Sequence, residues 1–235
     1  MNRDERQSRD LARPPQVFGN AIYPLEPGGE GTWISVNTTG ITLALLNKNL
    51  SGGMYLKSRS RAEVIPALAS SEALPEIQRR LLELGCKGML PFRLFAISPN
   101  EREVCEWRWM DSKLTSQTHD WKPLHWYSSG MSDEEAERRR GAAVQVAWKQ
   151  PDAGSVEWLR ALHRSHEPKR GAFSLCVHRD DASTVSYSEI LVDNNRVEFR
   201  YASGSPCESH GFDAAVNLSR SQPFAPEMQH KISNF

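Results

Sequence analysis

The stretch that decides the fold is GGEGTWISVNTTGITLALLN, from Gly28 to Asn47. Residues 32–36 and 41–46 are rich in β-branched and apolar side chains, and NTTG at 37–40 carries turn residues, so the pattern predicts a β-hairpin. The glycines at 28, 29 and 31 permit close backbone approaches. The second strand shows almost no polar alternation before Asn47, which predicts a strand covered on both faces and hence a layered domain. The Asn47 amide either caps that strand or is directed at a ligand, and the spacing alone favours the cap.

Runs of strands and runs of helices follow one another along the rest of the chain. Apolar periodicity, N-cap residues and stop signals predict helices at 62–68, 75–84, 132–148 and 155–163, and strands at 91–98, 104–110, 124–127, 173–178, 184–193 and 197–201. Such segregated runs favour packed mixed layers over a doubly wound parallel sheet. Residues after 203 are polar and proline-rich, so we predict one domain over residues 1–207 and a polar C-terminal tail over 208–235.

The composition excludes several classes of function. The 235 residues carry 29 basic and 29 acidic side chains, so no general electrostatic attraction to nucleic acid is expected. The run Arg138–Arg140 follows acidic residues on a predicted helix and is interpreted as a solvated face. No apolar run is long enough to span a bilayer, the charged N-terminus lacks the apolar region of a signal peptide, and the four cysteines lack CxxC spacing. These features predict a cytoplasmic protein that binds a small-molecule ligand or substrate, with no nucleic acid and no membrane span.

Motifs for common catalytic and cofactor chemistry are absent from the sequence. It contains no GxSxG elbow, no GxGxxG turn and no GxxxxGK[ST] loop. His163, His166 and His178, with Asp180 and Asp181, are residue types that bind zinc or iron. Their spacing fits no strong zinc pattern, so we predict no metal site and no resident cofactor.

An ordered set of motifs resembles the NRDE-domain family, the transport and Golgi organisation protein two-like proteins. The signature is Asn2-Arg3-Asp4-Glu5, followed by an Arg- and Pro-rich stretch at 9–15. Next come a GGTW-type hairpin at 28–37, a strand that ends in Asn47, an SRG-type turn at 58–60 and a block at 163–190. The resemblance touches most of the chain apart from the predicted tail.

The NRDE family resembles the N-terminal-nucleophile hydrolases, especially the penicillin acylase and bile-salt hydrolase branch. This resemblance implies an α+β fold, a four-layer αββα sandwich. It also implies that Arg3 and Asp4 orient a nucleophile while the Asn47 amide holds an oxyanion, so these three are the predicted catalytic residues. The predicted ligand-binding residues are Asn2, Glu5, Trp33, Asn37, Ser58, Arg59, Ser128 and Ser129.

The sequence departs from the family pattern at its start. NRDE proteins begin with Met-Cys and a strand before the tetrapeptide, whereas here the tetrapeptide follows Met1 directly. In the hydrolase branch that cysteine thiol attacks an amide and its own α-amine serves as base. With the first strand and its cysteine missing, the chain as given is expected to lack this chemistry and to expose an unpaired sheet edge.

Two functions follow from the resemblance. The first is hydrolysis of an amide or acyl bond in a small molecule by a form that carries the cysteine. The second is a non-catalytic carrier or trafficking role, because eukaryotic relatives are linked to haem handling, lipid metabolism and Golgi organisation. In that role Trp33, Trp107 and Trp109 would line a pocket for a flat apolar ligand such as haem, with His163 or His166 at its iron. The alternative is that these tryptophans are ordinary core.

Overall fold

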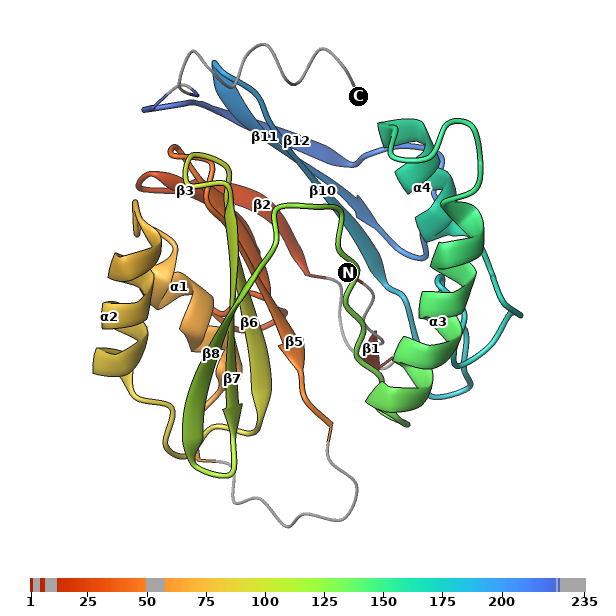
Figure 1. Cartoon of the computed structure of the whole chain (residues 1–235), viewed down its shortest axis with the longest axis horizontal. Helices are drawn as coiled ribbons and strands as arrows, with labels where there is room; N and C mark the ends of the chain where they lie inside the picture. The colour runs from red at the N-terminus through yellow and green to blue at the C-terminus, as the bar shows by residue number, and fades with distance from the viewer. Residues whose placement is uncertain (2–4, 7–11, 50–57, 223, 225–235) are drawn as a thin grey trace.

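The chain forms four layers, in the order helices, sheet, sheet, helices (Figure 1). This computed structural model describes residues 1, 5–6, 12–49, 58–222 and 224, with the side chains of residues 5 and 6 left out. Helices α1 (Val64–Leu68) and α2 (Leu74–Leu84) form one outer layer, and α3 (Asp133–Ala147) and α4 (Val156–Arg164) form the other. The αββα sandwich that the family resemblance implied is therefore confirmed.

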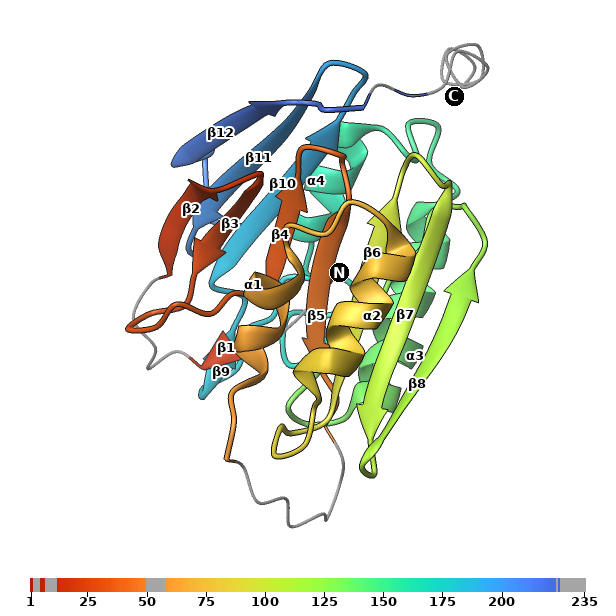
Figure 2. The same cartoon turned by 90° about the vertical axis from the view of Figure 1, so that its left-hand side faces the viewer.

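A seven-stranded sheet lies under α1 and α2, with its strands in sequence order and each neighbouring pair antiparallel (Figure 2). Its strands are β2 (Arg13–Phe18), β3 (Ala21–Leu25), β4 (Ile34–Asn37), β5 (Thr42–Asn47), β6 (Phe92–Ser98), β7 (Glu103–Met110) and β8 (Lys113–His119). A short 3-10 helix, η1 (Arg61–Glu63), precedes α1.

The second sheet contains β10 (Ser186–Val192), β11 (Arg196–Ser203) and β12 (Ala214–Ser219) in that order. Within the described residues β10 pairs with β11 alone, so the sheet has an open edge at β10. A separate pair joins β1 (Glu5–Arg6) to β9 (Ala182–Ser183). No helix in the described ranges is both long enough and apolar enough to cross a membrane.

The central hairpin forms as predicted, with Ile34 opposite Ala44 and Val36 opposite Thr42. Strand β5 is covered on both faces. Leu43 and Leu45 belong to the apolar core under α1 and α2, whereas Ala44 and Leu46 line a cavity on the other face of the sheet. A Cβ atom at Gly31 would lie 2.3 Å from the Ala62 Cβ, so only glycine permits the close approach expected there.

The largest error of the sequence-based prediction lies at the C-terminal end. Residues 208–235 are predicted to form a polar tail, but 214–219 form strand β12, which pairs with β11; residues 223 and 225–235 of the predicted tail lie outside the described residues. The apolar side chains of Val216 and Leu218 alternate with polar ones and pack between the sheets. A three-residue alternation is too short to stand out from its polar surroundings, although it suffices for a strand that covers one face of a core.

Other elements were missed or misplaced. The hairpin β2–β3 and strand β8 were not predicted, because β2 begins with Arg13 and two prolines and β8 is almost wholly polar. The strand predicted at 173–178 is an irregular loop, and 124–127 is not a regular strand. Arg140 corrects the solvated-face interpretation of Arg138–Arg140, because its side chain is fully buried.

The Arg140 guanidinium links α3 to neighbouring loops. It donates to the carbonyl oxygens of Ser128 at 3.1 Å, Ala172 at 3.0 Å and Ser174 at 3.0 Å. Buried backbone carbonyls need such donors, and arginine supplies several from one planar group.

Asn37 at the end of β4 is the residue that organises the central turn. Its side chain is 1% exposed. The Oδ1 atom accepts from the backbone amides of Thr39 and Ile41 and from the Thr39 hydroxyl, while Nδ2 donates to the carbonyls of Ala69 and Ser71. One amide thus fixes the turn and joins it to the end of α1.

Replacing Asn37 by Ala leaves these buried groups without partners, so we expect Asn37→Ala to lower the free energy of unfolding by about 3 kcal/mol. Urea denaturation measures the change. The matched control is Asn217→Ala on β12, where the side chain is exposed and the expected change is within about 0.5 kcal/mol. Equal effects of the two substitutions would contradict the assigned role.

Candidate functional site

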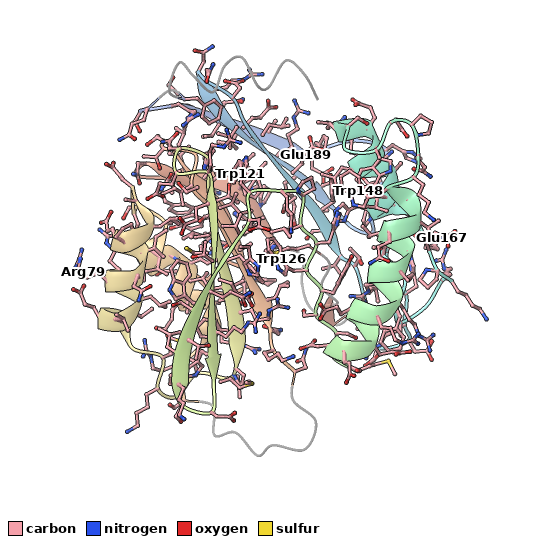
Figure 3. The ribbon with its side chains drawn as sticks, in the orientation of Figure 1. Arg79, Trp121, Trp126, Trp148, Glu167 and Glu189 are labelled. Carbon is pink, nitrogen blue, oxygen red and sulfur yellow. The ribbon has the colours of Figure 1, made fainter. Side chains whose placement is uncertain are left out.

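A cavity of about 650 Å³ lies between the two sheets and is closed on one side by α4. Trp33, Ile34, Thr42, Ala44 and Leu46 line it from the first sheet, Tyr187 and Glu189 from β10, Leu159 and His163 from α4, and Trp121, Leu124, His125 and Trp126 from the segment after β8. Trp126 and Glu189 project into the region between the seven-stranded sheet and α3–α4 (Figure 3). Volume and position are those of a small-molecule site.

The walls of the cavity are mainly aromatic and aliphatic. Trp33 comes from the segment that leads into β4, and the Trp126 ring packs against Phe95 at a tilt of 35°, with ring centroids 4.2 Å apart. Covering apolar ligand surface with flat apolar walls of this kind makes the free energy of binding more favourable, and such walls form few directional contacts with the ligand. The cavity therefore suits a ligand with a large apolar part.

Helix α4 places one imidazole at the cavity. Leu159 and His163 are four residues apart and share the face that meets the cavity, whereas Trp158 and Leu162 pack into the core between α3 and α4. The His163 ring lies 5.3 Å from the Tyr187 ring between centroids. Burial lowers the pKa of His163 well below its usual value, helped by the nearby amino group of Met1, so this side chain is neutral at pH 7.

A charged network lies beside His163 on the second sheet. Glu189 accepts two hydrogen bonds from Arg160 at 2.8 and 2.7 Å and one from Arg200 at 3.1 Å, and the Tyr187 hydroxyl donates to it at 3.3 Å. Burial alone raises the pKa of Glu189, but the hydrogen bond from Arg160 and the two guanidinium charges lower it overall. The carboxylate therefore stays ionised, and it holds Tyr187 as a fixed hydroxyl at the cavity wall.

Two further basic groups at the cavity are also neutral. Burial lowers the pKa of the Met1 amino group to about 6. Burial lowers the pKa of His125 to about 4, with a second contribution from the Met1 amino group. Neutral nitrogens can accept protons or bind uncharged polar groups, so the site offers proton acceptors in an apolar setting.

The predicted catalytic residues are only partly described. Arg3 and Asp4, together with the predicted ligand-binding Asn2, lie outside the described residues, and so does the Glu5 side chain. Asn47 ends β5 opposite Phe92 and is half-buried, but it is not among the residues that line the cavity. The catalytic site predicted from Arg3, Asp4 and Asn47 therefore stays a prediction.

Ser128 and Ser129 lie at a structural junction before α3. The backbone amide of Ser129 donates to Asp133 at 2.8 Å, and the Ser129 carbonyl accepts from the Asn49 side chain at 2.9 Å. The Asn49 backbone amide also donates to Asp133, at 3.0 Å. These contacts connect the chain after β5 to the start of α3, outside the cavity lining.

Three other predicted ligand-binding residues also have structural partners. Asn37 holds the central turn, as described above. Ser58 is exposed, and its backbone amide donates to the Gly88 carbonyl at 3.0 Å. The Arg59 guanidinium donates to the Gly85 carbonyl at 2.8 Å and to Glu63 at 3.1 Å, on the side of the sheet that carries α1 and α2.

Of the three tryptophans considered for a pocket, two are ordinary core, which is the alternative given in the sequence analysis. Trp33 lines the cavity, but Trp107 and Trp109 lie on the opposite face of the first sheet in the core under α2. Their indole nitrogens donate to Gln78 and to the Met89 carbonyl, each at 3.1 Å. Alternation along β7 placed both on one face correctly, but it could not say which layer covers that face.

Several cavity residues were not found from the sequence. Tyr187 and Glu189 lie two residues apart in a correctly predicted strand, so their shared face was available as a signal. Trp121, His125 and Trp126 lie in an irregular segment whose path depends on the layers around it. No pattern in the sequence marks them.

Comparisons with known proteins identify the fold. No family model matches the chain, and no curated protein sequence matches it. A mutant of the conjugated bile acid hydrolase from Clostridium perfringens superposes with a TM-score of 0.54 at 10% identity, over 92% of this chain and 87% of that one. A second variant of that enzyme gives a TM-score of 0.50 at 9% identity, over 96% and 94% of the two chains.

The chain has the N-terminal-nucleophile hydrolase fold. A third structure, penicillin V acylase from Agrobacterium tumefaciens, superposes with a TM-score of only 0.40 at 13% identity, over 85% of this chain and 74% of that one. At identities this low the likeness establishes the fold alone, and activity and substrate must be argued from the site.

The neutral histidines predict an acid-sensitive fold. Because the pKa of His125 falls from 6.5 to about 4 on folding, the unfolded chain binds a proton that the folded chain does not, and stability falls as the pH drops below 6.5. His163, whose pKa is also lowered, adds in the same direction. We expect a slope of at most about 1.4 kcal/mol per pH unit for each histidine.

Urea denaturation between pH 7 and pH 5 tests this, since carboxylates titrate mainly below that range. His125→Gln is expected to flatten the slope. The control His210→Gln changes an exposed histidine and is expected to leave the slope as it is. A slope that His125→Gln does not alter would contradict the buried neutral state.

Proposed function

We propose that this chain is an NRDE-type member of the N-terminal-nucleophile hydrolase fold that binds a small, largely apolar acyl compound between its sheets. The observation that carries the proposal is the cavity of about 650 Å³ with tryptophan and leucine walls and a few fixed polar groups. Apolar walls hold the acyl part, while Tyr187 and His163 supply directional contacts for an amide or ester. The neutral basic groups in the cavity favour an uncharged reacting group.

The finer proposal is hydrolysis of an amide or acyl bond. In that reaction Arg3 and Asp4 would orient the nucleophile, and Asn47, which does not line the described cavity, would have to turn toward it to hold the oxyanion that forms during attack. No described cysteine lines the cavity, because Cys86 and Cys105 pack around the first core and Cys176 and Cys207 lie elsewhere. The thiol is therefore proposed for a form of the protein with the family's cysteine before Asn2.

Ligand binding is tested with N-lauroylglycine, an acyl chain joined through an amide, by titration calorimetry. We expect binding that Trp33→Ala weakens at least tenfold, because that substitution removes a large apolar wall. The matched control is Trp148→Ala, another half-buried tryptophan that packs in the α3–α4 core and does not line the cavity. Equal affinity of Trp33→Ala and the unsubstituted protein would contradict binding at this site.

Hydrolysis is tested by placing a thiol at the cavity wall. Met1→Cys, produced behind a removable initiator methionine, carries both a thiol and a free α-amine where the Met1 amino group lies. We expect this variant to release p-nitroaniline from lauroyl p-nitroanilide, and iodoacetamide to abolish the release. Met1→Ala, processed in the same way, is the control. Binding of N-lauroylglycine without hydrolysis by Met1→Cys would favour a carrier.

A carrier of a flat apolar ligand is the second candidate, and the specific observation for it is that His163, next to Tyr187, lines the same apolar cavity as Trp33. A neutral imidazole is the form that binds haem iron. Haem titration is then expected to shift the Soret band, and His163→Ala to abolish the shift. His210→Ala is the control, and a shift that survives His163→Ala contradicts this site.

A further inference from the structure

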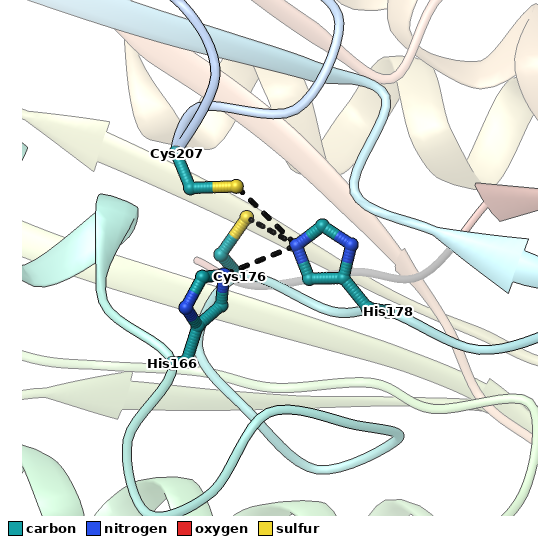
Figure 4. A group of neighbouring side chains, drawn as sticks. All are labelled: His166, Cys176, His178 and Cys207. Carbon is teal, nitrogen blue, oxygen red and sulfur yellow. Dashed lines mark hydrogen bonds between the residues drawn. The ribbon is translucent and has the colours of Figure 1, made fainter.

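Four side chains of the types that bind metal ions lie together outside the cavity (Figure 4). They are His166, Cys176, His178 and Cys207, and their ligand atoms all lie within 4.8 Å of one another. Cys176 is buried and the other three are half-buried. None of the four lines the cavity described above.

The three distances from His178 Nε2 to the other ligand atoms are close to the edges of a tetrahedral zinc site. With Zn–N of about 2.05 Å and Zn–S of about 2.3 Å, tetrahedral angles put two nitrogens about 3.3 Å apart and a nitrogen and a sulfur about 3.6 Å apart. The Nε2 atoms of His166 and His178 are 3.2 Å apart. His178 Nε2 lies 3.6 Å from the Cys176 sulfur and 3.3 Å from the Cys207 sulfur.

Hydrogen bonds alone do not account for this arrangement. His178 Nε2 has either one proton or one lone pair, yet three polar atoms, from His166, Cys176 and Cys207, converge on it. At most one of those contacts can be a well-formed hydrogen bond at any time. A cation placed among the four atoms satisfies all of them at once, with the two thiols as thiolates.

The backbone holds the four residues in place independently of any ion. The Cys176 amide donates to the Ser165 carbonyl at 2.9 Å, which brings Cys176 beside His166. His178 forms a β-bridge with Ser183, which lies in the segment just before β10. The Ser205 hydroxyl donates to the Thr184 carbonyl at 2.9 Å, which brings the loop of Cys207 onto the same segment. The side chains therefore converge from a supported loop framework.

We propose that His166, Cys176, His178 and Cys207 bind one Zn²⁺ ion in a closed, structural site. Four protein ligands fill a tetrahedral shell and leave no position for a substrate, and two thiolates with two neutral imidazoles match the charge and softness of zinc. Binding through Nε2 leaves the proton of His178 on Nδ1, so the half-exposed contact of the Arg170 guanidinium with Nδ1, at 3.3 Å, opens when the ion binds. Two thiols release about two protons on binding.

The site has a consequence for the segment that carries the NRDE signature. His178 lies just before β9, and β9 pairs with β1 through Ser183 with Glu5 and Ala182 with Arg6. The ion would thus fix the strand on which the beginning of the chain rests. It would also tie the loop after α4 to the loop between β11 and β12, so that elements from the outer helix layer and the second sheet are cross-linked.

Metal analysis of the full chain, purified without chelator, tests the site. We expect about one equivalent of zinc, and after exchange with Co²⁺ the visible absorption of tetrahedral cobalt with thiolate ligands. Cys207→Ser and His166→Ala are expected to lower zinc affinity at least tenfold. Matched controls are Cys105→Ser and His210→Ala, which lie outside the cluster and are expected to keep full zinc content.

Three results would overturn the assignment. One is zinc content that Cys207→Ser and His166→Ala leave unchanged. Another is a reduced, folded protein that takes up neither Zn²⁺ nor Co²⁺. The third is a Cys176–Cys207 disulfide found by mass spectrometry, with no metal uptake after reduction. Circular dichroism of each variant shows whether it has folded, and Co²⁺ spectra of the unsubstituted chain decide the question if a variant has not.

Discussion

Burial of β5 on both faces is the constraint on which the rest of the structure depends. A strand with apolar side chains on both sides needs a covering layer on each. Leu43 and Leu45 are covered by α1 and α2, while Ala44 and Leu46 face the space before the second sheet. Beyond that sheet, Arg160 of α4 donates to Glu189 of β10, which ties the outer helix layer to the second sheet and completes the four layers.

The same layering explains the chemistry of the cavity. The two sheets pack tightly where Ile22 and Val36 meet Phe199 and Tyr201, and they separate toward α4. Groups enclosed in the cavity between the sheets lose contact with water, so His125, His163 and the Met1 amino group are neutral. Glu189 keeps its charge because two arginines contact it. The site thus combines proton acceptors with apolar walls, which suits acyl compounds and flat apolar ligands alike.

The proposed zinc site and the cavity have different proposed roles: the zinc site would stabilise the fold, and the cavity would bind the ligand. The cavity uses side chains of strands and α4, whereas the cluster of His166, Cys176, His178 and Cys207 joins loops that have little regular structure of their own. Long irregular connections are costly to order, and a metal ion that binds only the folded chain shifts the equilibrium toward it. An ion bound by the cluster would therefore stabilise loops that lack regular secondary structure.

The sequence by itself determined the central hairpin, both outer helix pairs and the layered class, because these depend on local periodicity and on capping residues such as Ser132 and Ser155. It also placed Trp107 and Trp109 on one strand face. Only the tertiary structure decided that this face meets α2, that 214–219 join the second sheet, and that Cys207 reaches His178. These are contacts between residues far apart in the chain, and local spacing carries no information about which layers and loops meet.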